Sequence, residues 1–295
     1  MHTAVRTEVH WIRGCRYCLT VVGDGPRDAL LLHGFPDAPA NMMGLAHGLA
    51  QRGWRVAVPY LRGYGLSESS PGADLSLAGL AADVGELLDA LGFQHTLLVG
   101  HDWGSAVAQA VADGPRVAGV ALLSVPPIPW LIAGLPRDPG QLRRSAYMGA
   151  FQVPGAVHAL QATGGTYVDR LWRSWSPRFQ ASEAQLAAAR RALAPPGALA
   201  TALGYYRALW PRRPARWRAS LAITNRPLPV PALVLGGTDD ACIGPGFFRG
   251  DPTAAFAQRH QVTLIEGAGH FLPVEAPRAV LAAIDAFFGR PEGAQ

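Results

Sequence analysis

The chain contains no lysine and has little charge of either sign. All 26 basic residues are therefore arginine, and the formal net charge is +5 over 295 residues. Charged residues make up only 16% of the chain and hydrophobic residues 49%, which excludes an intrinsically disordered protein. A basic chain can bind nucleic acid, but these arginines are scattered, so we expect no nucleic-acid partner. The densest group is interpreted as an exposed surface segment and consists of Arg212, Arg213, Arg216 and Arg218.

Cysteine is also scarce, with three residues in the chain. Cys15 and Cys18 form a CxxC pair, but it lies near the N-terminus and outside the βαβ context of thioredoxin-like sites. No second pair and no histidine at ligand spacing accompanies it, so we expect neither a metal nor a redox cofactor. Cys242 is interpreted as a small packing residue.

Long apolar runs are missing. No segment approaches the roughly 20 apolar residues that a membrane span requires. The N-terminal residues include Arg6, Glu8 and Arg13 where a signal peptide would have an apolar core. We therefore expect a cytoplasmic protein without a membrane partner. Separately, we expect it to be a monomer or a homodimer.

Short apolar runs alternate with helix-like stretches along most of the chain. Runs such as Thr96–Val99 have no polar alternation, which is typical of strands buried on both faces. Ser76–Leu91 opens with a capping residue and has apolar residues at helical spacing. This order predicts an α/β fold with a mostly parallel sheet between helices. The expected strands are Thr7–Arg13, Arg16–Val22, Ala29–His33, Arg55–Pro59, Thr96–Val99, Val117–Ser124, Ala232–Leu235 and Gln261–Ile265, and the expected helices are Asn41–Arg52, Ser76–Leu91, Ser105–Asp113 and Pro277–Phe288.

Residues 126–229 interrupt the alternation. This interval opens with three prolines between Pro126 and Pro129 and closes with three between Pro227 and Pro231. Helix formers dominate it, as in Ser182–Leu193, and it holds five of the eight tryptophans and four of the seven tyrosines. The pattern predicts a helical cap at 126–229 over a core domain formed by residues 1–125 and 230–295.

Asp102 lies at a sharp turn between a predicted strand and a predicted helix. It is the central residue of Gly100–Gly104, which follows the apolar run Thr96–Val99 and precedes the helix-like Ser105–Ala110. A strand, a glycine-flanked turn and a helix form a nucleophile elbow, in which serine is the usual central residue.

An aspartate at this turn changes the chemistry. A carboxylate with a reference pKa of about 3.9 is ionised at neutral pH and needs no base to activate it. Its attack on an acyl carbon would give a reactive anhydride, whereas its attack on a saturated carbon gives an ester that water can cleave. Asp102 therefore indicates displacement at carbon, as in epoxide opening or carbon–halogen cleavage.

The chain resembles the α/β-hydrolase fold family, and within it the epoxide hydrolase and haloalkane dehalogenase branch. His33–Pro36 is similar to the family's oxyanion-loop motif, Arg62–Ser67 to the turn after its fourth strand, and Gly100–Gly104 to its aspartate elbow. These motifs occur in the family's order, and the resemblance spans roughly residues 28 to 288. It implies an eight-stranded, mostly parallel sheet with a helical cap inserted after the sixth strand.

The resemblance also implies a histidine base and an acid that orients it. His270 lies after the last strand and before the last helix, where this family has its base, whereas the side chain of His101 is expected to pack behind the site. The family's spacing from Gly237 selects Asp240 as the relay acid, with Asp239 as the alternative.

Two cap tyrosines would donate hydrogen bonds to the epoxide oxygen. Tyr147 lies in a segment similar to that of the family's first tyrosine, and Tyr206 precedes Arg207 as the second tyrosine does. Tyr205 is the competing choice for the second role.

A halide would need different groups around it. Trp103 could offer an indole N–H, as in haloalkane dehalogenases, but Phe35 stands where those enzymes have asparagine. The dehalogenase therefore remains an alternative, as does a divergent hydrolase that acts on, or only binds, a bulky metabolite.

The expected enzyme is an epoxide hydrolase that uses no metal and no organic cofactor. Asp102 attacks an epoxide carbon, the backbone N–H groups of Phe35 and Trp103 form the oxyanion hole, and water activated by His270 releases a diol. The cap aromatics favour an apolar small-molecule substrate. The residues expected to bind it are Phe35, Trp103, Phe151 and Phe271.

Overall fold

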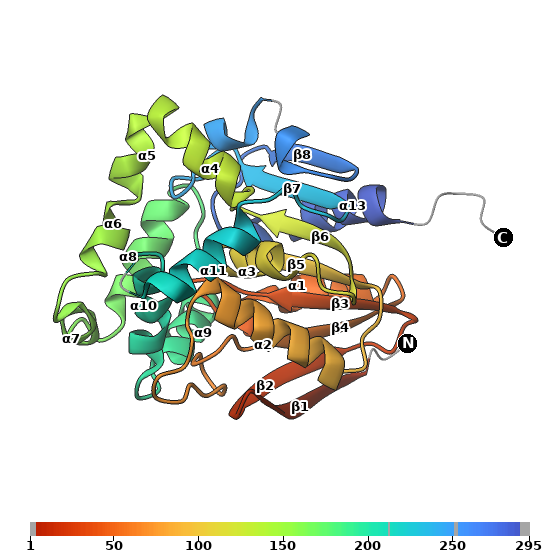
Figure 1. Cartoon of the computed structure of the whole chain (residues 1–295), viewed down its shortest axis with the longest axis horizontal. Coiled ribbons are helices and arrows are strands. Elements are labelled where there is room, and N and C mark those ends of the chain that lie inside the picture. Colours follow the sequence, from red (N-terminus) through yellow and green to blue (C-terminus); the bar gives the residue numbers. More distant parts are fainter. Residues whose placement is uncertain (1–3, 212, 251–252, 290–295) are drawn as a thin grey trace.

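The computed structural model describes residues 4–211, 213–250 and 253–289. Their eight strands form one sheet. Its strand order is β1-β2-β4-β3-β5-β6-β7-β8 (Figure 1). The β1–β2 and β2–β4 pairs are antiparallel and the remaining pairs are parallel, which confirms the predicted α/β fold. The strands are β1 Val5–Ile12, β2 Cys15–Val22, β3 Arg27–Leu32, β4 Trp54–Pro59, β5 Thr96–His101, β6 Val117–Leu123, β7 Ala232–Gly237 and β8 His260–Ile265.

Helices cover both faces of the sheet (Figure 1). The helices α1 Pro39–Ala50 and α13 Pro277–Phe288 pack on one face, and α2 Leu77–Ala90 and α3 Trp103–Val111 pack on the other. α2 begins at the expected cap, where the Ser76 hydroxyl accepts a hydrogen bond from the N–H of the third helical residue. This bond satisfies an amide that the helix itself leaves free.

The described residues between β6 and β7 contain helices and no strand, as the sequence predicts. We call residues 126–229 the inserted segment; Figure 1 shows its helices gathered beside the carboxyl ends of the parallel strands. Its helical elements are α4 Ile128–Gly134, η1 Leu135–Arg137, α5 Pro139–Arg144, α6 Ala146–Ala150, α7 Ala156–Gln161, α8 Thr166–Trp175, α9 Glu183–Leu193, α10 Ala198–Ala208 and α11 Pro214–Thr224.

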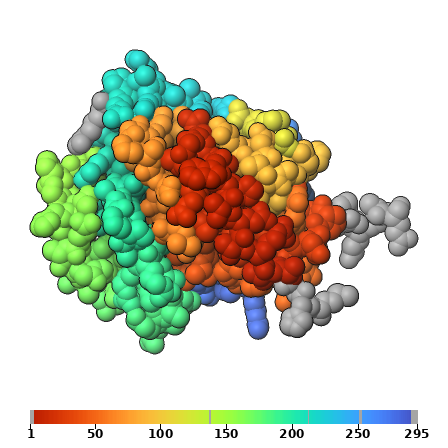
Figure 2. All heavy atoms as spheres, turned by 90° about the horizontal axis from the view of Figure 1, so that it is seen from below, coloured from red at the N-terminus to blue at the C-terminus, as the bar shows by residue number. Residues whose placement is uncertain are grey.

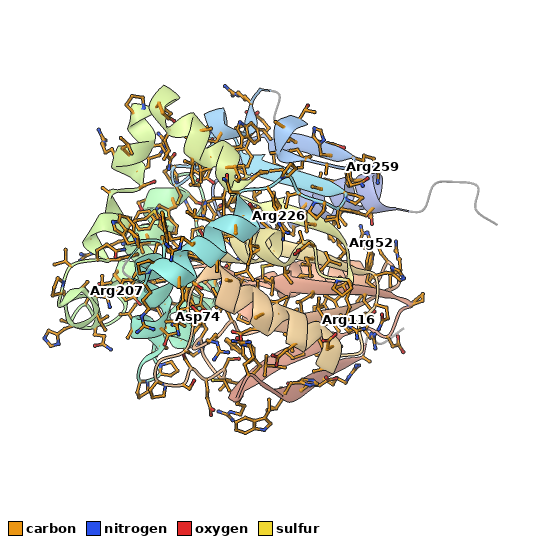
Figure 3. All side chains as sticks on the ribbon, in the orientation of Figure 1. Arg52, Asp74, Arg116, Arg207, Arg226 and Arg259 are labelled. Carbon is orange, nitrogen blue, oxygen red and sulfur yellow. The ribbon has the colours of Figure 1, made fainter. Side chains whose placement is uncertain are left out.

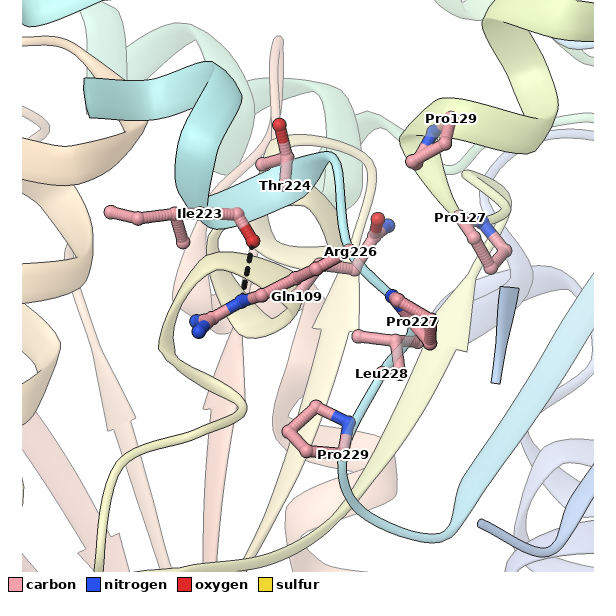
Figure 4. A pocket seen from close by; sticks show the side chains of 9 residues that line it. All are labelled: Gln109, Pro127, Pro129, Ile223, Thr224, Arg226, Pro227, Leu228 and Pro229. Carbon is pink, nitrogen blue, oxygen red and sulfur yellow. Dashed lines mark hydrogen bonds between the residues drawn. The ribbon is translucent and has the colours of Figure 1, made fainter. Parts of the chain in front are cut away.

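The two connections of the inserted segment to the sheet lie side by side (Figure 4). Gln109 of α3 holds the entering connection, because its side chain donates to the Pro126 carbonyl at 3.2 Å and accepts from the Ile128 N–H at 2.9 Å. In the returning connection, Arg226 donates to the Ile223 carbonyl. Both connections line one small hollow, formed by Gln109, Pro127, Pro129, Ile223, Thr224, Arg226, Pro227, Leu228 and Pro229.

The labelled arginines lie at separate places in the molecule (Figure 3), and several pair with a nearby acid. In the arginine-rich segment around residues 212–218, Arg216 pairs with Asp74 at 3.5 Å, while Arg212 lies outside the described residues. The arginine–acid pairs are Arg52–Asp285, Arg116–Asp89 and Arg226–Asp113.

In the part of the chain that the structure describes, no helix has the length and apolar character needed to cross a bilayer.

β1 forms an exposed edge of the sheet, on the face shown in Figure 2. Val5, Val9 and Trp11 alternate along it and are 54%, 51% and 69% exposed. Arg6 and Glu8 form an ion pair at 2.6 Å on the same strand. Charged side chains on an edge strand oppose unwanted pairing with other strands.

Candidate active site

Asp102 lies at the turn between β5 and α3. β5 ends at His101 and α3 begins at Trp103, so a single residue makes the turn. Its backbone has φ 52° and ψ −116°, a conformation that costs a residue with a side chain about 1–3 kcal/mol. Asp102 is 6% exposed and lies at the N-terminus of α3, where the helix dipole stabilises a carboxylate by about 0.3–1 kcal/mol.

Two glycines make room for this turn. A Cβ on Gly104 would lie 2.0 Å from the carbonyl oxygen of Leu32, and a Cβ on Gly34 would lie 2.4 Å from Oδ1 of Asp102. Neither contact is sterically possible, so larger residues would force the loop after β3 away from the carboxylate. The close approach lets the backbone N–H of Phe35 donate to Oδ1 of Asp102 at 2.8 Å.

His270 lies between two carboxylates. Its Nδ1 is 2.9 Å from Oδ2 of Asp240, and its Nε2 is 3.5 Å from Oδ2 of Asp102. Burial alone would lower the pKa of His270, but the two carboxylates raise it to about 10. Burial would raise the pKa of Asp102, but the His270 ring holds it below its ordinary value. The two carboxylates therefore favour the protonated form of the His270 ring in the resting site.

The two candidate acids have different surroundings. Asp240 is 4% exposed, and its Oδ1 accepts hydrogen bonds from the N–H groups of Cys242 at 2.7 Å and Ile243 at 2.9 Å. Asp239 instead forms an ion pair with Arg178 at 3.0 Å. The geometry therefore brings Asp240, and not Asp239, into contact with the histidine ring.

The loop that carries His270 is tied to the inserted segment. The Ser176 hydroxyl accepts from the backbone N–H of His270 at 2.8 Å and donates to Glu275 at 2.6 Å. Glu275 ends α12 Leu272–Glu275, and it also accepts from the N–H groups on either side of the histidine, at 2.7 and 2.8 Å. These bonds fix the backbone from which the imidazole projects.

His101 is fully buried behind the site. Its Nε2 lies 2.9 Å from the carbonyl oxygen of His270, and an acceptor at that position requires Nε2 to carry the proton. Its Nδ1 faces Oδ2 of Asp37 at 3.7 Å. Burial lowers the pKa of His101 to about 3 and raises that of Asp37 to about 7. Sequence reasoning did not single out Asp37, which directly follows the His33–Pro36 motif.

The inserted segment brings Tyr147 of α6 and Tyr206 of α10 together, with 5.8 Å between the ring centroids. Burial raises the pKa of both hydroxyls well above the ordinary value, and the charge of Asp102 adds to the shift. The Tyr206 hydroxyl is buried without a hydrogen-bond partner among the described residues. The Tyr205 hydroxyl instead donates to the Arg62 carbonyl at 2.7 Å, so its hydrogen bond lies within the protein core.

Aromatic rings surround the carboxylate and the two tyrosines. Phe35 packs against Phe151 and Tyr206, with ring centroids 5.5 and 5.4 Å apart. Trp103 packs against Tyr206 at 5.0 Å, and Phe271 lies edge-on to the histidine ring at 5.3 Å. All four residues expected to bind substrate are thus buried around the site.

Two further residues of this site were not found from the sequence. The Cys242 thiol, expected to be a packing group, lies 3.7 Å from the Tyr147 hydroxyl. Gln141 of α5 donates to the Cys242 carbonyl at 2.7 Å and accepts from the Gly244 N–H at 3.1 Å. No sequence pattern marks either residue, because the contact joins positions about a hundred residues apart.

The other two cysteines lie apart from the site. Cys15 and Cys18 are buried free thiols on β2, and the Arg62 guanidinium donates to Sγ of Cys15 at 2.8 Å. Within the described ranges, no cluster of three or more histidine, cysteine, aspartate or glutamate residues could hold a metal ion.

Comparison with known proteins places the chain in a family. The model of the alpha/beta hydrolase fold matches residues 30–277. Epoxide hydrolase A of Mycobacterium tuberculosis is 31% identical over 311 residues, which cover 92% of this chain and 93% of that protein. Epoxide hydrolase 3 of Siraitia grosvenorii is 29% identical over 317 residues, which cover 94% and 96%. The crystal structure of epoxide hydrolase A from Mycobacterium thermoresistibile has the same fold, with a TM-score of 0.79 at 24% identity over 96% of this chain and 98% of that chain. The chain belongs to the α/β-hydrolase fold family, in its epoxide hydrolase branch.

Proposed function

We propose that the protein is an epoxide hydrolase in which Asp102 forms a covalent ester with the substrate. The observation that carries this proposal is a buried carboxylate on a strained turn, held by a backbone N–H and facing the His270–Asp240 pair. A carboxylate in this setting is an ionised nucleophile that needs no base for its attack. The epoxide hydrolase relatives support the same reaction.

In the first step, Oδ2 of Asp102 attacks one epoxide carbon and the carbon–oxygen bond on that carbon breaks. The departing oxygen takes the bond electrons and becomes an alkoxide. Tyr147 and Tyr206 donate hydrogen bonds to this oxygen, and one of them transfers its proton. The product is a hydroxyalkyl ester on Asp102.

Ester formation prepares the second step, because it removes the negative charge next to His270. The pKa of this histidine is raised partly by Asp102, so it falls when Asp102 becomes an ester, and the ring gives its proton to the tyrosinate formed in the first step. The neutral ring, oriented by Asp240, then takes a proton from water, which attacks the ester carbonyl.

The tetrahedral oxyanion would be stabilised by the backbone N–H groups of Phe35 and Trp103. Its collapse breaks the ester bond and leaves the oxygen of water in the Asp102 carboxylate. One proton of that water returns His270 to its resting charge and the other ends on the second diol oxygen, so the enzyme is restored.

Residues 126–229 would act as a cap over a core formed by residues 1–125 and 230–295. The hydrogen bonds of Trp172 to the Pro36 carbonyl and of Ser176 to the histidine loop support this division. The cap supplies both tyrosines and much of the aromatic lining, which favours an apolar small-molecule epoxide as substrate.

The test is intact-protein mass after His270→Gln is exposed to aryl and alkyl epoxides and to haloalkanes. This variant can alkylate Asp102 but cannot hydrolyse the ester, so we expect a mass gain equal to one whole epoxide. Adding Asp102→Asn should remove the gain. An alkyl gain without the halogen would instead identify a dehalogenase, and the absence of any adduct would contradict the covalent route.

A further inference from the structure

The backbone of Cys242 is fixed at both ends. Its N–H donates to the relay acid Asp240 at 2.7 Å, and its carbonyl accepts from Gln141 at 2.7 Å. The side chain has one rotatable bond before its sulfur, so a fixed backbone leaves few positions for the thiol. Cys242 is 1% exposed, and its Sγ lies 3.7 Å from the Tyr147 hydroxyl.

Gln141 links this backbone to the part of the cap that carries Tyr147. Its side-chain oxygen accepts from Gly244 at 3.1 Å and from Arg144 at 3.0 Å. Its side-chain nitrogen also donates to Ser145, the residue before α6, at 3.0 Å. Gln141 is 1% exposed, and its side-chain oxygen and nitrogen are both hydrogen-bonded. It therefore fixes the distance between the start of α6 and the loop that carries Asp240.

The surroundings of the thiol indicate that a ligand binds next to it. The Tyr206 hydroxyl is a buried polar group without a hydrogen-bond partner among the described residues. It belongs to the proposed epoxide site, as does Tyr147, whose ring centroid lies 5.8 Å from that of Tyr206. Burial raises the pKa of Cys242 well above its ordinary value, so the sulfur keeps its proton.

We propose that Cys242 is a positioning residue for Tyr147: the Cys242 S–H donates to the phenol oxygen and so leaves the phenol proton free to point toward the epoxide oxygen. This inference rests on the proposed function. A hydrogen bond received by a hydroxyl strengthens the bond that the same hydroxyl donates. Sulfur also accepts hydrogen bonds only weakly, so the thiol competes little with the epoxide oxygen for the phenol proton.

The kinetic test measures alkylation alone, in the His270→Gln background, by intact mass at timed intervals. Cys242→Ala should slow alkylation by about threefold to tenfold, the range expected for one lost hydrogen bond. Cys242→Ser keeps a donor at the same place and should stay within about twofold of the parent. Cys18→Ala is the matched control, since it removes a buried thiol far from the site and should leave alkylation unchanged.

A double-mutant cycle separates positioning from general packing. With Tyr147→Phe present, Cys242→Ala should slow alkylation no further. In the protein that retains His270, Cys242→Ala should leave ester hydrolysis unaffected. An unchanged alkylation rate in Cys242→Ala overturns the proposal. A loss of equal size with and without Tyr147 also overturns it, because the thiol would then act only by packing.

A substrate-free measurement distinguishes failure of this inference from failure of the proposed function. The infrared S–H stretching band of Cys242 is identified by its loss in Cys242→Ala. Replacing Tyr147 by Phe should shift this band to higher frequency, since the thiol loses its hydrogen-bond partner. An unmoved band overturns the contact whether or not the protein opens epoxides, whereas a shifted band without epoxide turnover would contradict only the proposed reaction.

Discussion

The backbone N–H of Phe35 donates to Oδ1 of Asp102, which makes the two carboxylate oxygens inequivalent. Oδ1 is held at 2.8 Å, while Oδ2 faces the His270 ring at 3.5 Å. The held oxygen becomes the carbonyl oxygen of the proposed ester, so the N–H group that fixes the nucleophile is already in place for the oxyanion. One loop thus serves both steps of the proposed reaction.

Asp102→Asn should lower turnover by about a thousandfold or more, because a neutral amide is a poor nucleophile. Initial rates with an epoxide that the parent converts measure this loss. Mass spectrometry must confirm that the asparagine has not deamidated during the assay. Substantial activity in a verified Asn preparation would rule out the covalent mechanism.

Replacing both Tyr147 and Tyr206 by Phe should slow alkylation by about a hundredfold to a thousandfold, since the developing alkoxide loses its donors. The matched control is Tyr205→Phe. Its hydroxyl bonds to the Arg62 carbonyl, so its loss should cost about 0.5–1.5 kcal/mol of unfolding free energy and spare alkylation. The reverse pattern would assign the donor role to Tyr205.

Asp240→Asn should slow ester hydrolysis by about a hundredfold or more, because the histidine loses the carboxylate that orients it. Asp239→Asn removes only an ion pair with the exposed Arg178 and should keep hydrolysis within about twofold. The decay of the adduct after rapid mixing measures this rate. Equal losses in the two variants would show that the relay role does not belong to Asp240 alone.

The raised pKa of His270 predicts a pH-dependent stability. Its protonated form is favoured in the folded state, so this contribution is complete below the unfolded value of about 6.5 and is lost as pH rises through about 10. Denaturant unfolding should therefore show a larger loss of stability across this window in the parent than in His270→Gln. Parallel curves for the two proteins would argue against a charged resting histidine.

Glu275→Gln should disturb the His270 loop more than the fold. The carboxylate accepts from two backbone N–H groups and from Ser176, and the amide can keep only part of this set. We expect ester hydrolysis to fall about tenfold while alkylation changes little, since Asp102 is held separately. Rapid-mixing measurement of both steps tests this, and an equal loss in both would indicate that the whole site has moved.

The sequence by itself determined the alternating α/β fold, the helical nature of residues 126–229 and the turn at Asp102. These features depend on local patterns: buried strands read as continuous apolar runs, and a sharp turn between strand and helix requires small flanking residues. Every expected strand overlaps an observed one for this reason. The position of His270 also follows from chain order, because the carboxyl ends of parallel strands meet at one edge of the sheet.

Only the tertiary structure decided between neighbouring side chains. Tyr205 and Tyr206 are adjacent on α10, and successive helical residues point about 100° apart, so the rotation of the packed helix selects the one that faces Asp102. The same holds for Asp239 and Asp240, where the path of the loop after β7 turns one carboxylate toward His270. Cys242 meets Tyr147 because the inserted segment folds back over the sheet, and no local pattern specifies a contact between residues so far apart in the chain.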